Sequence, residues 1–553
     1  MRIKAFLIPV ILWASASSLQ SQNLGPFVNA YHSVGLNEDG TVYTWGRNNV
    51  GQLGDNTTTN RSDPIKVLKG AYSGTTYLGD DSDNKITAVA IGYRHSMALA
   101  TDGTVYAWGA NGYGQLGDNT TTNRSTPIKV LEGAYSGTTY LGDDSDNKII
   151  AIAVGSYHSI ALANDGTVFA WGRNNYGNLG DNSTTNSSVP VKVEDGAYSG
   201  TTYLGDNSDN KITAVAAGNY YSFAIATDGT VFAWGYNSVG QLGDNTNTNR
   251  STPIKVLEGA YSGTTYLGDD SDNKIIAVST GVFHSLALAN DGTVFAWGAN
   301  EYGNLGDNST TNSSVPVKVE DGAYSGTTYL GDNSDNKITA VSAGGNYPSI
   351  ALAEDGTVFA WGYNDPGNLG DGTTTSRSTP VKVLKGAYSG TTYLGDNSSN
   401  KIISVAAGES HSVALARDGS VFAWGRGTLG QLGDGTSSNR STPVKVTGVG
   451  GSGYLSLDKN APTVSSVALA SDNSTLAVTF SEAVYTTTDA SSALVVGDFA
   501  FSISGGTATL SSATPSSISI SGNVYTLGIS LSGTPDGSET LTVNPLTATA
   551  IYD

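Results

Sequence analysis

Cysteine is absent from this 553-residue chain, and charged residues make up only 14% of it. The absence of cysteine excludes disulfides, zinc–thiolate sites and thiol nucleophiles. Lys and Arg together number 28 against 48 Asp and Glu, which gives a formal net charge of −20. This deficit of cations argues against nucleic acid as a partner, because such binding depends on basic side chains that neutralise phosphates. No segment shows a helical hydrophobic period, yet 38% of the residues are hydrophobic, which is enough for a packed core.

The first 22 residues are typical of a secretory signal peptide. Arg2 and Lys4 precede a short apolar run, Ala5–Trp13, and residues 14–16 form an Ala-Ser-Ala cleavage pattern. The alternative is a buried N-terminal strand. The apolar run is too short for a membrane span, and no later segment approaches 18 apolar residues. We therefore expect an exported protein, secreted or held at the surface of a bacterium, without a membrane span.

A repeat of 63 or 64 residues fills most of the chain. It is marked by seven tryptophans, each within D-G-[TS]-V-[YF]-[AT]-W-G and followed by G-[QN]-L-G-D: Trp45, Trp108, Trp171, Trp234, Trp297, Trp361 and Trp424. A fixed period of this kind indicates a repeat architecture, in which each unit is one small supersecondary structure.

Each repeat contains four expected strands. In the third repeat, residues 158–172 form two β-rich runs around an Asp-Gly turn, and residues 148–155 and 189–193 supply one strand on each side. Pro190 predicts that the last strand is an edge strand. Gly172, Gly177 and Gly180 are expected where the backbone bends or passes another backbone. Four strands in each of seven units predict an all-β, seven-bladed propeller over residues 23–450, with a β-solenoid as the alternative.

The repeat resembles that of the regulator of chromosome condensation (RCC1) family. The pattern A-x-G-x-x-H-S-x-A-L-x-x-D-G-x-V-[YF]-x-W-G carries the resemblance, which covers about residues 24–450, with Ala90–Asp118 and Ala217–Asp244 as close examples. The resemblance implies a seven-bladed propeller. It also suggests guanine-nucleotide exchange on a GTPase, or protein binding as in an exported bacterial member that inhibits β-lactamases.

The chain departs from the usual repeat in two places. An insertion, G-A-Y-S-G-T-T-Y-L-G-D, follows each of the first six units, beginning at Gly70, Gly133, Gly196, Gly259, Gly322 and Gly386. The first unit lacks a complete first strand, and Pro26–Val28 stands in its place. We expect the ring to close by joining the two ends of the propeller segment.

No set of residues indicates catalysis. All five histidines fall at one repeat position, 13 residues before a blade tryptophan, and Tyr221 and Pro348 replace histidine in two units. A residue in symmetric copies that proline can replace is expected to be structural, because a catalytic site needs one asymmetric constellation. We therefore predict a protein that is not an enzyme. The acids are expected to serve turn chemistry, and no cofactor is expected, although the acidic run 80–84 makes calcium an alternative.

Antiparallel connectivity predicts two different faces. The insertions should lie on the face that carries the Asp-Gly turns. The opposite face collects the positions that differ most among the units, and several of them are Arg or aromatic residues, which protein interfaces favour. The candidate partner-binding residues are Arg47, Tyr113, Arg173, Tyr176, Tyr236, Phe283, Tyr302, Tyr363 and Arg426. The alternative is unselected variation of a surface.

The composition changes after a linker, residues 451–462. Residues 463–553 are rich in Ser, Thr, Val and Leu, and they contain runs such as 476–485 and 497–503 that alternate like half-buried strands. This segment resembles the immunoglobulin-like domains of bacterial adhesins in V-T-F-S-E-A-V-Y and in residues 533–543. The resemblance implies a β-sandwich that acts as a spacer or adhesive module. Because such proteins usually continue past a sequence like residues 551–553, we expect a longer natural protein.

These observations favour a monomeric, non-enzymatic scaffold that binds a protein or a surface glycan. A regulator of a GTPase and a carbohydrate-active enzyme or lectin are the alternatives.

Overall fold

The computed structural model describes residues 30–135, 139–198, 202–261, 265–324, 328–345, 348–398 and 400–457, and near the C-terminus residues 464–470, 474–480, 496, 499–504, 507–521, 524–532 and 540–545. The expected signal peptide and the segment Pro26–Val28 lie outside the described residues. The chain divides into two compact units, one ending at Asp458 and the other beginning at Lys459. No helix among the described residues is long and apolar enough to cross a membrane.

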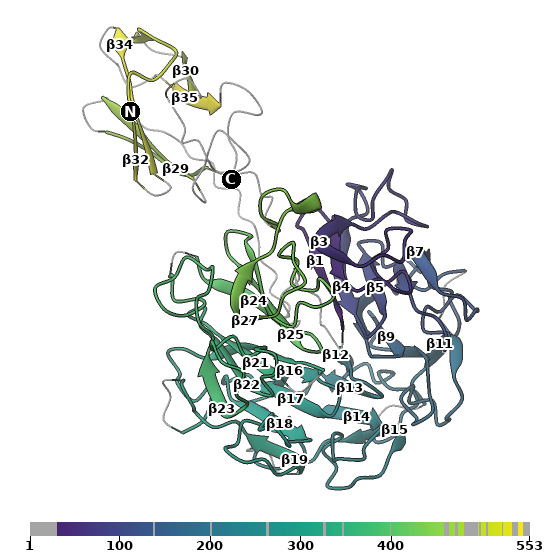
Figure 1. Ribbon diagram of the computed structural model, residues 1–553. Helices are drawn as coiled ribbons and strands as arrows, with labels where there is room; N and C mark the ends of the chain where they lie inside the picture. Colours follow the sequence, from purple (N-terminus) through teal and green to yellow (C-terminus); the bar gives the residue numbers. More distant parts are fainter. Residues whose placement is uncertain are drawn as a thin grey trace. The chain divides into compact units, whose positions relative to one another are not determined.

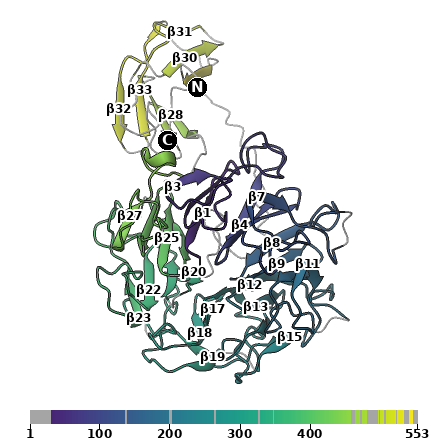
Figure 2. The same ribbon diagram turned by 45° about the vertical axis from the view of Figure 1, so that its right-hand side comes forward.

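The larger unit contains seven consecutive antiparallel sheets arranged around a ring (Figures 1 and 2), and we number these sheets as blades 1 to 7. Blade 1 has three described strands, β1 (His32–Leu36), β2 (Val42–Gly46) and β3 (Arg61–Lys66). Blades 2 and 3 have four each, namely β4 (Ile86–Ile91), β5 (His95–Ala100), β6 (Val105–Gly109) and β7 (Arg124–Lys129), then β8 (Ile149–Val154), β9 (His158–Ala163), β10 (Val168–Gly172) and β11 (Ser187–Lys192).

Blades 4 to 7 repeat the four-stranded pattern. Blades 4 and 5 contain β12 (Ile212–Ala217), β13 (Tyr221–Ala226), β14 (Val231–Gly235) and β15 (Arg250–Lys255), then β16 (Ile275–Thr280), β17 (His284–Ala289), β18 (Val294–Gly298) and β19 (Ser313–Lys318). Blades 6 and 7 contain β20 (Ile338–Ala343), β21 (Pro348–Ala353), β22 (Val358–Gly362) and β23 (Arg377–Lys382), then β24 (Ile402–Ala407), β25 (His411–Ala416), β26 (Val421–Gly425) and β27 (Arg440–Lys445).

The strands follow their chain order within each blade, as the hairpin pattern predicts. In blade 3 the order is β8-β9-β10-β11, and Trp171 pairs with Ser159 across the hairpin that the Asp-Gly turn closes. The first strands of neighbouring blades contact one another at the centre of the ring. The strand that carries Pro190 is the outermost, which confirms the predicted edge strand. Its edge is not bare, because Ala134 of the preceding insertion donates its N–H to the carbonyl of Pro190 at 2.8 Å.

The ring closes through contacts between blades 7 and 1, near the two ends of the propeller segment, as expected. The indole N–H of Trp45 in blade 1 donates to the carbonyl of Gln431 in blade 7 at 3.0 Å. After β27 the chain turns through a short 3₁₀ helix, η1 (Val449–Gly451), and Leu457 donates its N–H to the carbonyl of Gly419. Among the described residues, no strand pairs a blade 7 segment with blade 1. The closure includes further contacts: Glu409 donates its main-chain N–H to the carbonyl of Ala30 at 3.1 Å, and the hydroxyl oxygen of Thr447 lies 2.9 Å from a carboxylate oxygen of Asp63.

The apolar core lies between adjacent blades rather than at the centre of the ring. One tryptophan per blade is fully buried, and each core cluster combines residues of two or three successive blades, with blade 1 packing against blade 7. Gly177 confirms the close backbone approach expected of it, since a Cβ there would lie 2.5 Å from Cα of Ser251 in the next blade. Gly180 differs, because its nearest neighbours are the side chains of Trp234 and Val193 and not a backbone.

The smaller unit is also built of strands in its described part. Its largest sheet has the order β28 (Val464–Leu469), β29 (Thr475–Phe480), β33 (Val524–Gly528) and β32 (Ile518–Ser521). Two further pairs join β30 (Phe499–Ser504) with β35 (Thr540–Pro545) and β31 (Thr509–Leu510) with β34 (Leu531–Ser532). Its buried cluster consists of Leu476, Val478, Phe499, Phe501, Tyr525, Leu527 and Ile529. Residues 481–485 and 533–539, which carry much of the resemblance to adhesin domains, lie outside the described residues.

Candidate binding face

The histidines lie in the core and join neighbouring blades. All five side chains are fully buried, and Nε2 of each lies 2.8–3.0 Å from the hydroxyl of a serine in the next blade, for example His158 and Ser222. The same serine donates to the carbonyl of Asn178, which also accepts the indole N–H of Trp234. Since the serine proton is used in that bond, the neutral histidine must donate from Nε2. Burial lowers the pKa of each histidine to about 3.

The two blades without histidine show how the junction tolerates a change. In blade 4 the hydroxyl of Tyr221 donates its one proton to the carbonyl of His284 at 2.7 Å, and the carbonyl of Gly281 lies 3.1 Å from the same oxygen. In blade 6 the Pro348 side chain is buried, and Ser412 of blade 7 keeps its bond to the carbonyl of Asn368. The serine and tryptophan bonds to one carbonyl occur at all seven junctions, whereas the histidine bond occurs at five.

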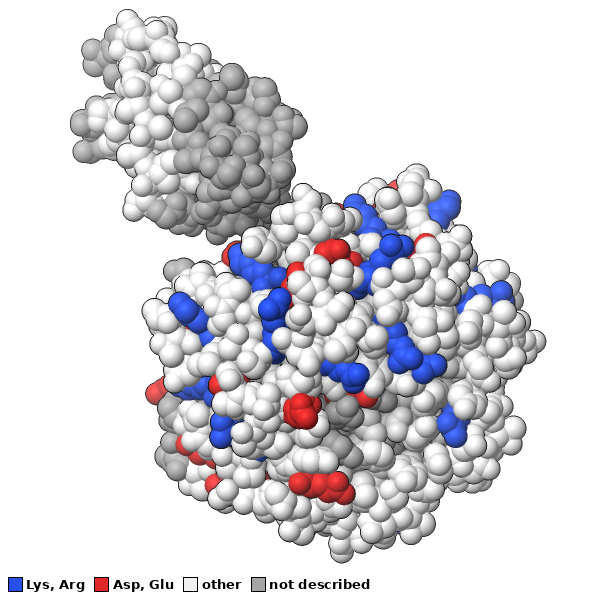
Figure 3. Space-filling model, in the orientation of Figure 1, with Lys and Arg blue, Asp and Glu red and all other residues white. Residues whose placement is uncertain are grey.

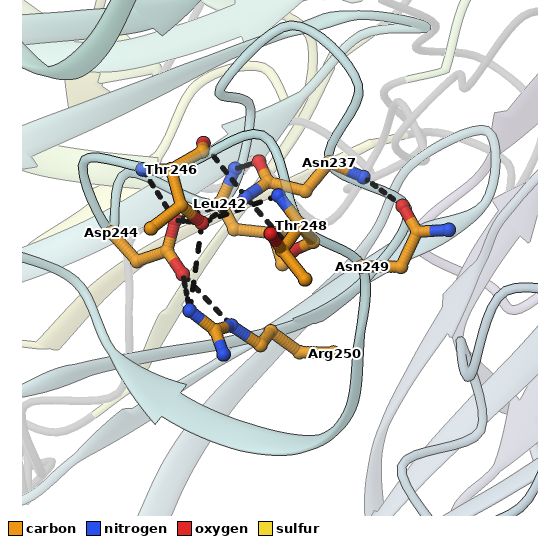
Figure 4. Close-up of polar contacts among 7 residues, drawn as sticks. All are labelled: Asn237, Leu242, Asp244, Thr246, Thr248, Asn249 and Arg250. Atoms are coloured by element: carbon orange, nitrogen blue, oxygen red, sulfur yellow. Dashed lines mark hydrogen bonds and ion pairs between the residues drawn. The ribbon is translucent and has the colours of Figure 1, made fainter.

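The L-G-D acids belong to a loop network, shown for blade 4 in Figure 4. Asp244 accepts bonds from Asn237, Thr246 and Arg250, and the Arg250 guanidinium lies 2.6 Å from it. The Asn237 side chain in turn accepts the N–H of Leu242. Although burial raises the pKa of Asp244, these hydrogen bonds hold it below its usual value. Five blades have this Arg–Asp pair, whereas blades 3 and 5 have serine in place of the arginine.

The insertion acids also bind their own loops. Asp80 accepts the N–H groups of Thr75, Thr76 and Tyr77. Asn84 and the turn residue Asp102 bond to each other in both directions, which places the insertion beside an Asp-Gly turn as predicted. Within the described residues no three acidic or histidine side chains are grouped to hold a metal ion. The contacts favour turn chemistry, and calcium stays an untested prediction.

The opposite face carries a continuous row of tyrosine rings across blades 1 to 4. Ring centroids lie 5.7 Å apart for Tyr31 and Tyr93, 5.7 Å for Tyr93 and Tyr157, and 5.4 Å for Tyr157 and Tyr220. Tyr113, Tyr176 and Tyr236 add further ring contacts at its edge. We call this row, with the arginines that lie on it, the arginine–tyrosine crescent: Tyr31, Arg47, Tyr93, Arg94, Tyr113, Tyr157, Arg173, Tyr176, Tyr220, Tyr236 and Arg426.

The arginines of the crescent pack on the rings. The Arg173 guanidinium carbon lies 4.8 Å from the ring centre of Tyr113, 5.5 Å from that of Tyr157 and 4.9 Å from that of Tyr220. Arg47 and Arg426 both approach Tyr31, at 5.2 and 5.6 Å. Cation–π contacts of this kind contribute roughly 0.5–1 kcal/mol each at a partly exposed site. They fix long side chains that would otherwise move freely.

Six of the nine candidate residues predicted from the sequence meet in the crescent: Arg47, Tyr113, Arg173, Tyr176, Tyr236 and Arg426. Tyr302 and Tyr363 form a separate pair on blades 5 and 6, with ring centres 4.7 Å apart. Phe283 lies half-buried on blade 5, outside the crescent.

Five members of the crescent were not among the nine candidates: the four tyrosines of the row, Tyr31, Tyr93, Tyr157 and Tyr220, and Arg94. Tyr93 stands one residue earlier than the position compared across blades, because blade 2 has Tyr-Arg before its histidine, whereas blades 1 and 3 have tyrosine directly before theirs. Comparing both residues before the histidine would have found it. Glu409 was missed as well. It accepts a hydrogen bond from the hydroxyl of Tyr31. Burial, and to a smaller extent this hydrogen bond, raises the pKa of Tyr31.

Comparison with known proteins gives one consistent result. Residues 199–492 match the RCC1-like domain, and residues 39–99, 102–162 and 165–225 match the regulator of chromosome condensation (RCC1) repeat. The ultraviolet-B receptor UVR8 of Arabidopsis thaliana is 30% identical over 417 residues, which are 75% of this chain and 79% of the plant protein. The Arabidopsis RCC1 domain-containing mitochondrial protein RUG3 is 29% identical over 406 residues, which are 71% of this chain and 76% of that protein.

Solved structures show the same fold. Human WBSCR16 superimposes with a TM-score of 0.57 at 24% identity, covering 74% of this chain and 94% of the human chain. Prp20p of Saccharomyces cerevisiae superimposes with a TM-score of 0.57 at 22% identity, covering 78% of this chain and 88% of the yeast chain.

Proposed function

The chain belongs to the RCC1-like domain family, and from this premise we propose that it is a non-enzymatic scaffold that binds a protein through the arginine–tyrosine crescent. A shared fold does not by itself give a function, so the proposal rests on the site. The yeast relative Prp20p is described by its binding to Gsp1p and histones, which makes protein recognition one known use of this fold.

The observation that carries the proposal is the unbroken row of four tyrosine rings, 5.4–5.7 Å apart, with Arg173 set among three rings. Tyrosine and arginine are enriched at the energetic centres of protein interfaces. Side chains already fixed by their neighbours lose little conformational entropy on binding, so more of the contact energy appears as affinity.

The other parts of the proposal come from the sequence. The basic and apolar N-terminus supports export, with the mature chain secreted or at a bacterial cell surface as a monomer. The resemblance of residues 463–553 to adhesin domains supports a spacer or attachment module of immunoglobulin type. Within the described residues, the histidines and the L-G-D acids have structural partners, which supports a scaffold over an enzyme.

The test compares two variants of the full chain. The first replaces Tyr113, Tyr176 and Tyr236 by alanine, which removes three rings from the edge of the crescent. The matched control replaces Ile150, Ile276 and Ile403 by threonine, the residue that other blades have at this position. These isoleucines are 50%, 41% and 42% exposed, next to the strand ends where the Asp-Gly turns lie.

Each protein is immobilised, and the proteins it retains from an extract of the source organism are identified by mass spectrometry. We expect a partner that the wild type and the isoleucine control retain and the tyrosine variant loses. Equal retention by all three proteins, with the same thermal unfolding midpoint, would refute the crescent as the binding face.

A further inference from the structure

Nine of the ten arginines of the propeller fall into two groups with different partners, and the tenth, Arg417, directly precedes an Asp-Gly turn. The five arginines that begin outer strands, Arg61, Arg124, Arg250, Arg377 and Arg440, each lie 2.6–2.8 Å from an aspartate of their own blade. The four arginines of the crescent, Arg47, Arg94, Arg173 and Arg426, pack instead on tyrosine rings. Within the part of the chain that the structure describes, none of these four forms an ion pair with a carboxylate.

The crescent arginines are nevertheless held in place. Nε of Arg47 donates to the side chain of Asn49, Nε of Arg173 to Asn175, and Nε of Arg426 to Thr428. Three blades therefore fix the arginine through the residue two positions further on. For Arg47 and Arg426 the hydrogen bonds to described residues use Nε alone. A guanidinium fixed in this way can still offer amino groups to a carboxylate, and the planar fork suits two parallel bonds.

The face is also polarised around the ring. The four arginines come from blades 7, 1, 2 and 3, which are consecutive in the closed ring. The residues between W-G and G-[QN]-L-G, and those directly before the histidine position, include three acids: Glu301 on blade 5, Asp365 on blade 6 and Glu409 on blade 7. Glu409 is buried and accepts a hydrogen bond from Tyr31. Figure 3 shows Lys and Arg spread around the drawn face of the propeller, with acids only in small groups, although the net charge is −20. Charges beyond about 8 Å are screened at physiological ionic strength, so the local arginines decide what binds there.

From these observations, and resting on the binding function proposed above, we propose that the partner presents an acidic protein segment, with Asp or Glu carboxylates that bind the four crescent arginines. Single-stranded nucleic acid would also need cations and aromatic rings, but it binds by stacking bases on ring faces. Here guanidinium groups lie over Tyr31, Tyr93, Tyr113, Tyr157 and Tyr220, and most ring pairs meet at steep angles. The crescent therefore favours carboxylates over bases.

The probe is a short fluorescent peptide of alternating Glu and Ser, compared with its Gln-for-Glu version and with an oligothymidine of similar length. Binding to the full chain is measured by fluorescence anisotropy at low and at physiological ionic strength. One variant replaces Arg47, Arg94, Arg173 and Arg426 by glutamine, and a second replaces them by lysine. The matched control replaces Lys85, Lys148, Lys211 and Lys274, at the Asp-Gly side, by glutamine, which changes the net charge equally.

We expect the Glu peptide to bind more tightly than the Gln peptide, and to lose about tenfold or more in affinity in the Arg→Gln variant. The Arg→Lys variant should lie between, because lysine keeps the charge but loses the paired bonds. The lysine control should bind like the wild type. Equal affinity for the Glu and Gln peptides, an unchanged Kd in the Arg→Gln variant, or tighter binding of the oligothymidine would each overturn the acidic partner.

The two proposals can fail separately. If the tyrosine variant loses its captured protein while the arginine variant binds the Glu peptide normally, the binding face stands and the acidic partner is refuted. If the tyrosine variant retains every captured protein, the proposed function is refuted whatever the peptide shows.

Discussion

Five buried histidines should make this propeller sensitive to mild acid. Their pKa falls from 6.5 to about 3 in the folded protein, because burial disfavours the charged form. Below about pH 6.5 the unfolded chain binds protons that the folded chain excludes until the pH reaches about 3. The stabilisation is therefore complete above about pH 6.5 and is lost progressively as the pH falls toward about 3.

The size of the effect follows from the histidine pKa in the unfolded chain. Each pKa unit corresponds to about 1.4 kcal/mol, so one buried neutral histidine lowers the free energy of unfolding by about 2 kcal/mol between pH 7 and pH 5. The perturbation is His95→Tyr with His284→Tyr, on blades 2 and 5. Tyr221 already fills this position in blade 4, where its hydroxyl reaches a carbonyl of the next blade. Between about pH 7 and about pH 5, we expect the wild type to lose about 4 kcal/mol more free energy of unfolding than the variant, because the variant lacks two of the five histidines.

The assay is urea unfolding followed by tryptophan fluorescence at about pH 7 and about pH 5, since one buried tryptophan reports on each blade. Comparing variant with wild type cancels the contribution of the many carboxylates. Trp234→Phe is the control, because it weakens a junction without removing a titrating group. If the histidine variant and the wild type differ in free energy of unfolding by the same amount at both pH values, the neutral, buried state of the histidines is refuted.

Three further predictions concern single positions. Trp234→Phe removes the indole bond to the carbonyl of Asn178 and leaves a small cavity, so urea unfolding should show a loss of about 2–3 kcal/mol. Gly70→Ala should cost about 2 kcal/mol or more in thermal unfolding, because φ is +53° and a Cβ would lie 2.1 Å from the carbonyl oxygen of Pro127. Gly112→Ala, with no atom within 4 Å of the new Cβ, should change little. Arg250→Ser should lower the free energy of unfolding by about 1 kcal/mol, because it removes the ion pair with Asp244. Ser187→Arg should raise it by a smaller amount, because the new arginine can pair with Asp181 of blade 3. The same urea unfolding midpoint for both variants would contradict this.

Much of the propeller could be predicted because each repeat carries its own local signals. The Asp-Gly turn closes the central hairpin, Pro190 marks the outer edge, and the period of the tryptophans gives the number of blades. The replacement of histidine by Tyr221 and Pro348 indicated a structural position, and the five histidines do lie buried at blade junctions. These inferences depend on contacts within one repeat or on its copy number.

What the sequence did not reveal depends on contacts between repeats. The carbonyl of Asn178, which accepts hydrogen bonds from Ser222 and Trp234 at a junction, is a main-chain group, so the repeated [QN] at this position does not reveal its role. The place of Gly180 against Trp234 depends on how the next blade packs. The role of Tyr93 was missed because it stands one residue before the aligned position in the repeat. Its ring nevertheless contacts Tyr31 and Tyr157, so the direction of the side chain, and not the alignment, places it in the row.

The central claim is that the arginine–tyrosine crescent is the surface that binds a protein. Hydrogen–deuterium exchange of the full chain, with and without a partner captured as described above, tests it most directly. The account predicts slower exchange in the loops around residues 47–51, 92–95, 110–114 and 173–177, and unchanged exchange in the Asp-Gly turns and insertions. Slower exchange confined to the Asp-Gly turns and insertions would contradict it.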